Sequence, residues 1–97
     1  VIVGNPTAYR SELERKIEAL GIEKHITFIG WQHDIAEVMA GLDVVVVPSE
    51  TEGFGRVVAE AMAAGRPVVA FAVDAIPELV VPGETGFLVR PRDADGI

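Results

Sequence analysis

Four consecutive valines, Val44–Val47, constrain the fold more than any other feature of the sequence. They stand between Asp43 and Pro48, so the apolar run is short and sharply bounded. Short apolar runs with sharp bounds are typical of strands, and β-branched side chains favour strands as well. A continuous apolar run without alternation is typical of a parallel-sheet strand that is buried on both faces. We therefore expect Val44–Val47 to form such a strand.

The rest of the chain alternates predicted strands with predicted helices. Apolar residues recur at helical spacing between Thr7 and Gly21, which predicts an amphipathic helix there. The expected strands are 1–3, 26–29, 44–47, 68–71 and 87–89, and the expected helices are 8–20, 35–39, 54–64 and 76–80. Short connections and right-handed crossovers favour an α/β fold, a Rossmann-like parallel sheet with helices on both faces.

Composition excludes several classes of protein. Fifteen acidic residues against eight basic ones give a net charge of −7, so we expect no nucleic-acid partner. The apolar runs are far shorter than the ~20 residues that a membrane span needs, and we expect no transmembrane segment. The chain has no cysteine, which excludes disulfides, thiolate metal sites and a cysteine nucleophile. The expected location is cytoplasmic, with a membrane-peripheral parent protein as the alternative.

The remaining polar signals predict ordinary roles and no metal site. His25 and His33 lack a partner ligand at metal-binding spacing, so we interpret both as loop residues. The Asp-x-Asp sequence at Asp93 is expected to begin a helix. Arg90 and Arg92 are expected to be solvated.

The two ends of the sequence suggest an excerpt. The chain begins at Val1, inside an apolar run, and stops at Ile97 directly after a helix-start signal. Domains usually begin and end in exposed linkers, so we expect residues 1–97 to be one partial domain, lacking its first strand or strands. The strand at 1–3 would then have an unpaired edge, and we expect self-association or poor solubility of this piece.

The loop Ser49–Gly55 is the candidate site. It leads from the valine strand into a helix, and parallel α/β sheets bind ligands at the carboxyl ends of their strands. Its glycines let the backbone approach a ligand, and the free amides of the first helical turn suit an anion or an oxygen-rich ligand. Glu52 lies in this loop, and Glu60 follows eight positions later on the flank of the helix.

Each glutamate also has an ordinary interpretation. Glu60 follows Arg56 by four residues, so the two could form an exposed helical ion pair. Glu52 could simply be an acidic residue at the positive end of the helix dipole. Spacing alone leaves these alternatives open.

Two longer motifs carry a resemblance to a known family. They are Pro48-Ser49-x-x-Glu52-Gly53-Phe54-Gly55 and Glu60-Ala61-Met62-Ala63-x-Gly65-x-Pro67-Val68-Val69-Ala70. Together they resemble the retaining, nucleotide-sugar-dependent glycosyltransferases of the group 1 type, which have the two-domain GT-B fold. Two glutamates separated by seven residues are the signature of that family. The resemblance continues through Phe28-Ile29-Gly30, Pro77-Glu78-Leu79-Val80 and Gly86-Phe87-Leu88-Val89.

The resemblance implies a donor-binding role for the loop and its helix. Glu52 matches the catalytic glutamate that contacts hydroxyls of the donor sugar and stabilises developing charge. Glu60 matches the glutamate that accepts hydrogen bonds from the ribose. The backbone amides of Gly53, Phe54 and Gly55 match those that contact the donor sugar and its diphosphate. No cofactor is implied beyond the donor substrate, a nucleotide diphosphate sugar.

Trp31 is a further candidate, because the nucleotide base packs near the corresponding turn in this family. The alternative is that Trp31 covers the edge of the sheet. The sequence departs from the family at Asp74-Ala75, where Gly-Gly is usual, and the effect on sugar choice stays open.

The resemblance also implies what this chain lacks. In the family, basic residues that clamp the diphosphate and the N-terminal, acceptor-binding domain lie upstream of the segment present here. We expect the full-length parent to transfer a sugar with retention to a sugar, lipid or polymer acceptor, and the piece alone to be inactive. The alternatives are a non-catalytic nucleotide-binding module and a nucleotide-sugar epimerase of the same architecture.

Overall fold

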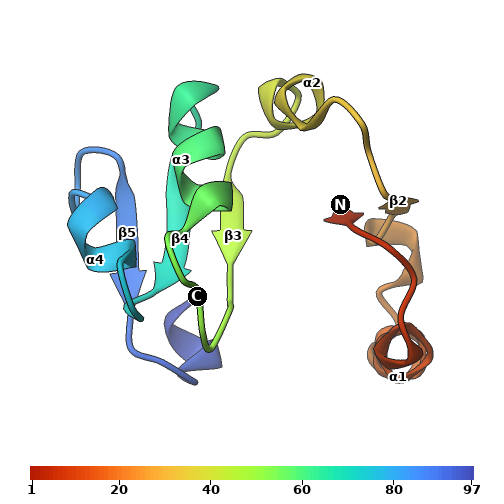
Figure 1. The fold of residues 1–97 in the computed structure, drawn as a ribbon. Helices are drawn as coiled ribbons and strands as arrows, with labels where there is room; N and C mark the ends of the chain where they lie inside the picture. Colours follow the sequence, from red (N-terminus) through yellow and green to blue (C-terminus); the bar gives the residue numbers. More distant parts are fainter. The chain divides into compact units, whose positions relative to one another are not determined.

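The computed structural model describes residues 1–97 as two compact units, Val1–His33 and Asp34–Ile97 (Figure 1). Strands alternate with helices in both units, and every strand pairs in parallel with its neighbour. Hydrogen bonds join the strands into a two-stranded sheet in the first unit and a three-stranded sheet in the second. This is the Rossmann-like α/β class that the sequence predicts.

The first unit is a strand–helix–strand segment. Its helix ends where Gly21 adopts a left-handed backbone with φ of 65°, as the sequence predicts. The second strand begins two residues later than expected, because a short 3-10 turn precedes it. The elements are β1 (Ile2–Val3), α1 (Ala8–Leu20), η1 (Glu23–His25) and β2 (Phe28–Gly30).

The first unit contains no fully buried side chain. On the apolar face of α1, Leu13 and Ile17 are half-buried, whereas Tyr9 and Leu20 are exposed. The guanidinium of Arg10 lies 4.6 Å from the centre of the Phe28 ring, a cation–π contact between α1 and β2. The unit is thus joined by the pairing of β1 with β2 and by contacts such as this one, without a closed core.

The second unit contains the candidate loop and most of the core. Its strands lie in the order β3–β4–β5, and their carboxyl ends all lie at the same end of the unit (Figure 1). Asp34 accepts a hydrogen bond from the Glu37 amide and begins the first helix, as predicted. The elements are α2 (Ile35–Ala40), β3 (Val45–Val47), α3 (Arg56–Ala63), β4 (Val68–Phe71), α4 (Ile76–Leu79), β5 (Gly86–Val89) and η2 (Ala94–Gly96).

One face of the three-stranded sheet packs against the helices. From α3, Val58 and Ala61 are fully buried, and Ile76 of α4 is fully buried as well. A side chain at Gly86 would collide with the backbone of Val68, so only glycine lets β5 lie this close to β4. The core comprises Met39, Val45, Val47, Val58, Ala61, Val68, Ala70, Ile76 and Val80.

The valine run behaves differently from the prediction. Val45 and Val47 are buried, but Val44 is 47% exposed and Val46 is 48% exposed. The expectation of burial on both faces is therefore wrong. Alternate residues of a strand face opposite sides: Val45 and Val47 face the helices of the core, whereas Val44 and Val46 face the other side of the sheet and stay exposed. Phe87 of β5 is also exposed on the sheet.

The burial of α3 predicts a sharp difference between adjacent valines. We expect Val58→Ala to lower the free energy of unfolding by about 2 kcal/mol, because two buried methyl groups are lost and a cavity remains. Val57, which is 39% exposed, is the matched control, and Val57→Ala should cost less than about 0.5 kcal/mol. Urea unfolding of both variants measures the difference. Equal losses would contradict the packing of α3 described here.

Candidate functional site

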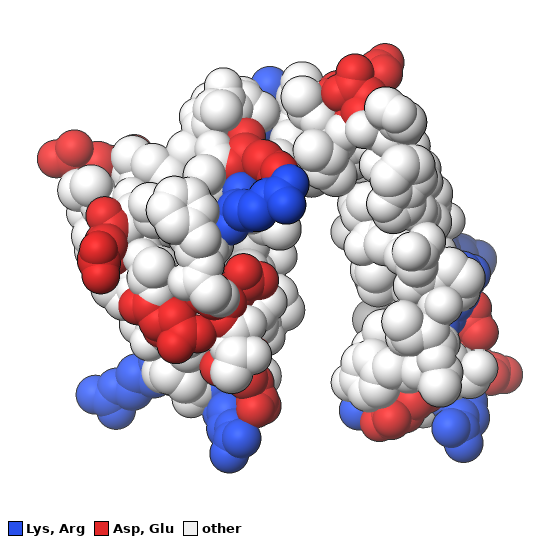
Figure 2. All heavy atoms as spheres, in the orientation of Figure 1, with Lys and Arg blue, Asp and Glu red and all other residues white.

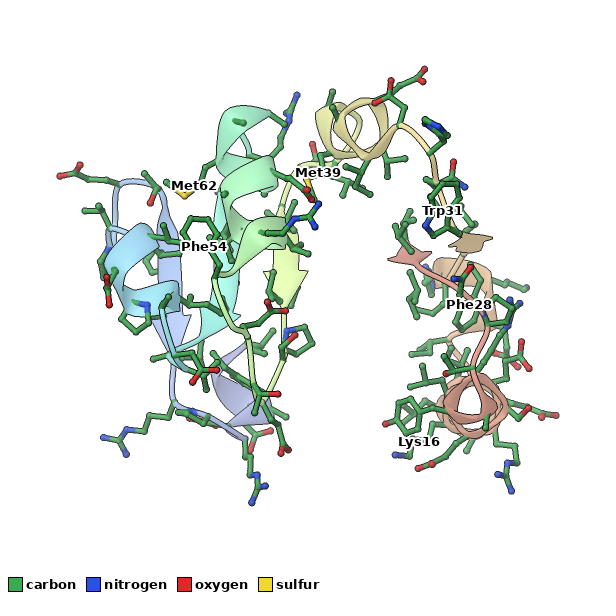
Figure 3. All side chains as sticks on the ribbon, viewed as in Figure 1. Lys16, Phe28, Trp31, Met39, Phe54 and Met62 are labelled. Atoms are coloured by element: carbon green, nitrogen blue, oxygen red, sulfur yellow. The ribbon has the colours of Figure 1, made fainter.

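The loop between β3 and α3, residues 48–55, lies at the carboxyl end of β3 (Figure 1). Gly55 has φ of 77° and directly precedes the helix, which begins at Arg56. The prediction of a helix from Phe54 is therefore wrong by two residues, because the left-handed backbone at Gly55 interrupts it. Phe54 is 68% exposed and lies beside the start of α3, outside its buried face (Figure 3).

Glu52 is held at two points. The hydroxyl Oγ of Ser49 donates a hydrogen bond to Oε1 of Glu52 over 3.0 Å. The backbone amide of Glu52 donates to Oδ2 of Asp74 over 2.7 Å. The second carboxylate oxygen of Glu52 accepts no hydrogen bond from the protein, so it is available to a hydroxyl group of a ligand.

Glu60 lies on α3, and its side chain is 34% exposed. Nη2 of Arg56 is 3.6 Å from Oε1 of Glu60, so the ion pair considered from the sequence is present. That separation is too long for a hydrogen bond, and such exposed helical pairs contribute only about 0.2–0.5 kcal/mol. The Glu60 carboxylate thus keeps its acceptor positions free for a ligand.

The two glycines of the loop differ in what they contribute. A Cβ at Gly55 would lie 3.1 Å from Cδ1 of Leu79, and the left-handed backbone adds strain for any other residue. A Cβ at Gly53 would meet nothing within 4 Å. Gly55 is therefore required by the fold, whereas Gly53 leaves open space beside the loop. The amides of Gly53, Phe54 and Gly55 donate to no protein acceptor, and they lie at the N-terminal end of α3, where the helix dipole is positive.

An ion pair ties the loop to the segment after β5. Nη2 of Arg92 lies 2.9 Å from Oε2 of Glu50, across 42 positions of sequence. The hydrogen bond from Arg92, together with its charge, lowers the pKa of Glu50, and the same bond raises the pKa of Arg92. Arg92 is solvated as expected, with its side chain 77% exposed, but it also forms an ion pair that the sequence analysis did not predict. Sequence reasoning missed this pair, because no local spacing relates the two residues.

The charge around the loop is mixed. Figure 2 shows both acidic and basic side chains at the end of the second unit where the strands terminate. Glu50, Glu52 and Asp74 bring carboxylates to this end, and Arg92 is engaged by Glu50. The backbone amides at the start of α3 are among the groups that remain able to meet an anion here.

Trp31 belongs to the first unit, beside the end of β2 (Figure 3). Its ring is 62% exposed and contacts His33 edge-on, with ring centres 5.7 Å apart. Most of the indole is thus free to stack on a planar group. Its role next to a nucleotide base stays a prediction.

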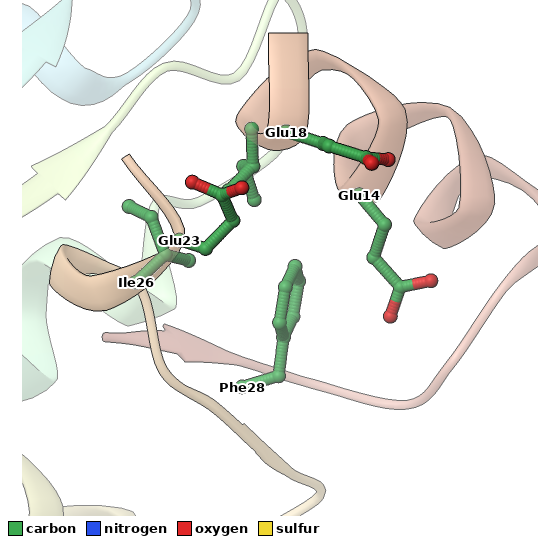
Figure 4. Close-up of a pocket in the computed structure, with 6 residues that line it drawn as sticks. Glu14, Glu18, Glu23, Ile26 and Phe28 are labelled. Carbon is green, nitrogen blue, oxygen red and sulfur yellow. The ribbon is translucent and has the colours of Figure 1, made fainter. Parts of the chain in front are cut away.

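Other features of the chain do not join this site. A cavity of about 480 Å³ lies in the first unit, where glutamates surround an apolar floor that includes Phe28 (Figure 4). A second, of about 310 Å³, lies between the end of α3 and the start of β5. Neither is lined by Glu52 or Glu60. The structure contains no group of three or more His, Asp or Glu side chains placed to hold a metal ion. None of its helices combines the length and apolarity that crossing a membrane demands.

Comparison with known proteins identifies the family. Residues 1–97 match the family model described as "Glycosyl transferases group 1". The chain belongs to this family, as the resemblance in its motifs predicts.

Individual relatives agree with this membership. The D-inositol 3-phosphate glycosyltransferase of Stackebrandtia nassauensis is 40% identical over 99 residues, which cover 96% of this chain and 22% of that protein. The crystal structure of Anabaena Alr3699/HepE in complex with UDP superposes with a TM-score of 0.92 at 39% identity, covering 97% of this chain and 27% of the other. The crystallised C-terminal domain of a group 1 glycosyl transferase, LpcC from Francisella tularensis, superposes with a TM-score of 0.77 at 40% identity, covering 87% and 45%.

The chain therefore spans only part of the proteins that it resembles. It covers between 21% and 28% of the length of the curated relatives. The similarity to a crystallised C-terminal domain agrees with the expectation of a C-terminal region.

The difference between the two glycines is testable. We expect Gly55→Ala to lower the free energy of unfolding by about 1–2 kcal/mol, because alanine is strained at positive φ and its methyl group would press on Leu79. Gly53→Ala is the matched control and should change stability by less than about 0.5 kcal/mol. Thermal or urea unfolding measures both variants. A Gly53→Ala variant as unstable as Gly55→Ala would disprove the distinction.

Proposed function

We propose that residues 1–97 are the donor-binding part of a retaining glycosyltransferase. The donor is a nucleotide diphosphate sugar, and the full-length parent transfers its sugar to a sugar, lipid or polymer acceptor. The acceptor binds through a further domain of the parent, and the piece alone is inactive. Anabaena Alr3699/HepE, which was also crystallised with UDP-glucose, supports a nucleotide sugar as the ligand of this region.

The arrangement of Glu52 carries the proposal. One of its oxygens is held by Ser49, and the other is free to accept from a sugar hydroxyl. A carboxylate in this position also stabilises positive charge as the sugar leaves the diphosphate. Glu52 is thus the proposed catalytic residue.

The remaining contacts bind the donor. Glu60, with both oxygens free of hydrogen bonds, accepts from the vicinal hydroxyls of the ribose. The amides of Gly53, Phe54 and Gly55 donate to oxygens of the sugar and the diphosphate. Trp31, which is 62% exposed, stacks against the base of the nucleotide.

The charge of the chain supports inactivity of the piece alone. A diphosphate carries negative charge, and the chain has a net charge of −7. Two of the cations near the loop are already paired, Arg56 with Glu60 and Arg92 with Glu50. We therefore expect cations from other parts of the parent to contribute to neutralising the diphosphate.

Substitution of Glu60 in the full-length parent tests the proposal. We expect Glu60→Gln to raise the KM for the donor about 10- to 100-fold, since charge-assisted hydrogen bonds worth about 1.5–3 kcal/mol are weakened. Arg56→Gln is the matched control, because it removes the ion pair and keeps the carboxylate. Its KM should stay within about twofold of the unsubstituted protein. Steady-state kinetics with varied donor measure both variants.

Three outcomes separate the alternatives. Unchanged kinetics of Glu60→Gln would defeat the donor-site assignment. Equal effects of Glu60→Gln and Arg56→Gln would assign Glu60 to the ion pair alone. Binding of UDP in a calorimetric titration without transfer to any acceptor would favour a nucleotide-binding module, and inversion of a sugar centre without an acceptor would favour an epimerase.

The sheet edges support a second proposal, that the isolated chain self-associates. Both β1 and β3 lie at the edge of their sheets, and Val46 is exposed on β3. Unpaired apolar edges recruit further strands. Sedimentation of the isolated chain should give masses above 10.3 kDa that rise with concentration. Val46→Lys should reduce this association, and the control Thr51→Lys, of equal charge, should not. A monomer at all concentrations would contradict the proposal.

A further inference from the structure

Asp74 stands out in the segment that follows β4. Its φ of 47° places a non-glycine residue in the left-handed region, and its side chain is exposed. No lysine or arginine pairs with its carboxylate. The one hydrogen bond of that side chain, 2.7 Å long, accepts from the backbone amide of Glu52, 22 positions earlier.

The positive φ of Asp74 indicates that its carboxylate has a role in the structure. Glycine adopts positive φ without strain, whereas aspartate is tolerated there at a cost. Strained residues persist where the surrounding structure uses them. Compared with glycine, aspartate adds a carboxylate at this position, and this carboxylate accepts the hydrogen bond from the Glu52 amide.

The bond joins two loops that lie next to each other at the carboxyl ends of neighbouring strands. Val47 at the end of β3 pairs with Ala70 of β4, so the segments that follow leave the sheet side by side. Asp74 then restrains the backbone of Glu52, while Ser49 restrains its carboxylate. Two independent restraints on one residue leave its free oxygen a narrow range of positions.

The same bond also determines which amides of the loop are free to bind a ligand. The amide of Glu52 is occupied by Asp74, and the amides of Gly53, Phe54 and Gly55 are not. For a ligand at the start of α3, the first free amide donor along the loop is therefore that of Gly53. Without Asp74, the Glu52 amide would be a further donor, and the loop would lose its restraint from the β4 side.

We propose that Asp74 is a positioning residue for Glu52, which it aims at the sugar of the donor by holding the Glu52 amide. This inference rests on the proposed function of Glu52. The one hydrogen bond of the Asp74 side chain goes to the Glu52 amide, so Asp74 acts through Glu52. Its loss acts on the chemical step more than on donor binding, since Glu60 and the amides of the loop remain.

Three variants of the full-length parent test the role. Asp74→Ala should lower kcat about 10- to 100-fold, as expected for a misplaced catalytic group, and change the KM for the donor less than threefold. Asp74→Asn keeps an oxygen acceptor and should restore kcat to within about fivefold of the unsubstituted protein. Asp74→Gly relieves the backbone and removes the acceptor, so it should lose as much kcat as Asp74→Ala while remaining at least as stable.

Two further measurements separate positioning from general stability. In the background of Glu52→Gln, Asp74→Ala should cause no additional loss of kcat, because it acts through Glu52. Hydrogen exchange should show faster exchange of the Glu52 amide in Asp74→Ala and Asp74→Gly. Asp43→Ala, a change of an exposed aspartate before β3, is the control and should leave kcat unchanged.

The outcomes distinguish this inference from the function on which it rests. If Glu52→Gln retains full activity, the proposed function itself fails. If Glu52→Gln is impaired but Asp74→Ala keeps its kcat, the positioning role is wrong. Additive losses in the double variant, or a Gly variant as active as the unsubstituted protein, would also overturn it.

Discussion

The packing of α3 against β3 and β4 is the contact on which the candidate site depends. Val58 and Ala61 are fully buried, so the helix has one permitted rotation about its axis. That rotation leaves Glu60 on the flank, where it is one-third exposed. It also sets where the loop 48–55 must end, because Gly55 lies under Leu79 and Ile76 of α4. The glutamate on the helix and the glutamate on the loop are thus positioned by the same apolar contact.

The loop itself is held by polar contacts. Asp74 restrains the Glu52 amide, Ser49 restrains its carboxylate, and Arg92 binds Glu50. These groups are largely exposed, so each bond contributes little to global stability. Their effect is local: they limit where carboxylate oxygens lie at the end of the sheet. A site built in this way combines an apolar scaffold that sets its place with hydrogen bonds that set its orientation.

Predictions from the sequence were correct where the signal lies within a few neighbouring residues. Gly21 ends its helix, Asp34 and Asp93 accept the capping hydrogen bonds expected of them, and the order of elements follows the apolar periodicity. The motif from Glu52 to Glu60 led to the family that the comparison of the whole chain identifies. Reasoning failed at Val46, because an apolar run does not reveal whether an element covers its second face. The predicted helix start at Phe54 was wrong too, since the periodicity of apolar residues cannot detect a left-handed backbone at Gly55.

The amino-acid sequence by itself determined the α/β alternation, the family and the residues of the candidate loop. These follow from periodicity, turn residues and a motif of fixed spacing, all of which act over a few positions. Only the tertiary structure decided that Asp74 reaches Glu52 and that Arg92 reaches Glu50, over 22 and 42 positions. Such pairs arise because parallel strands bring their carboxyl ends to one edge of a sheet, where loops far apart in the chain become neighbours.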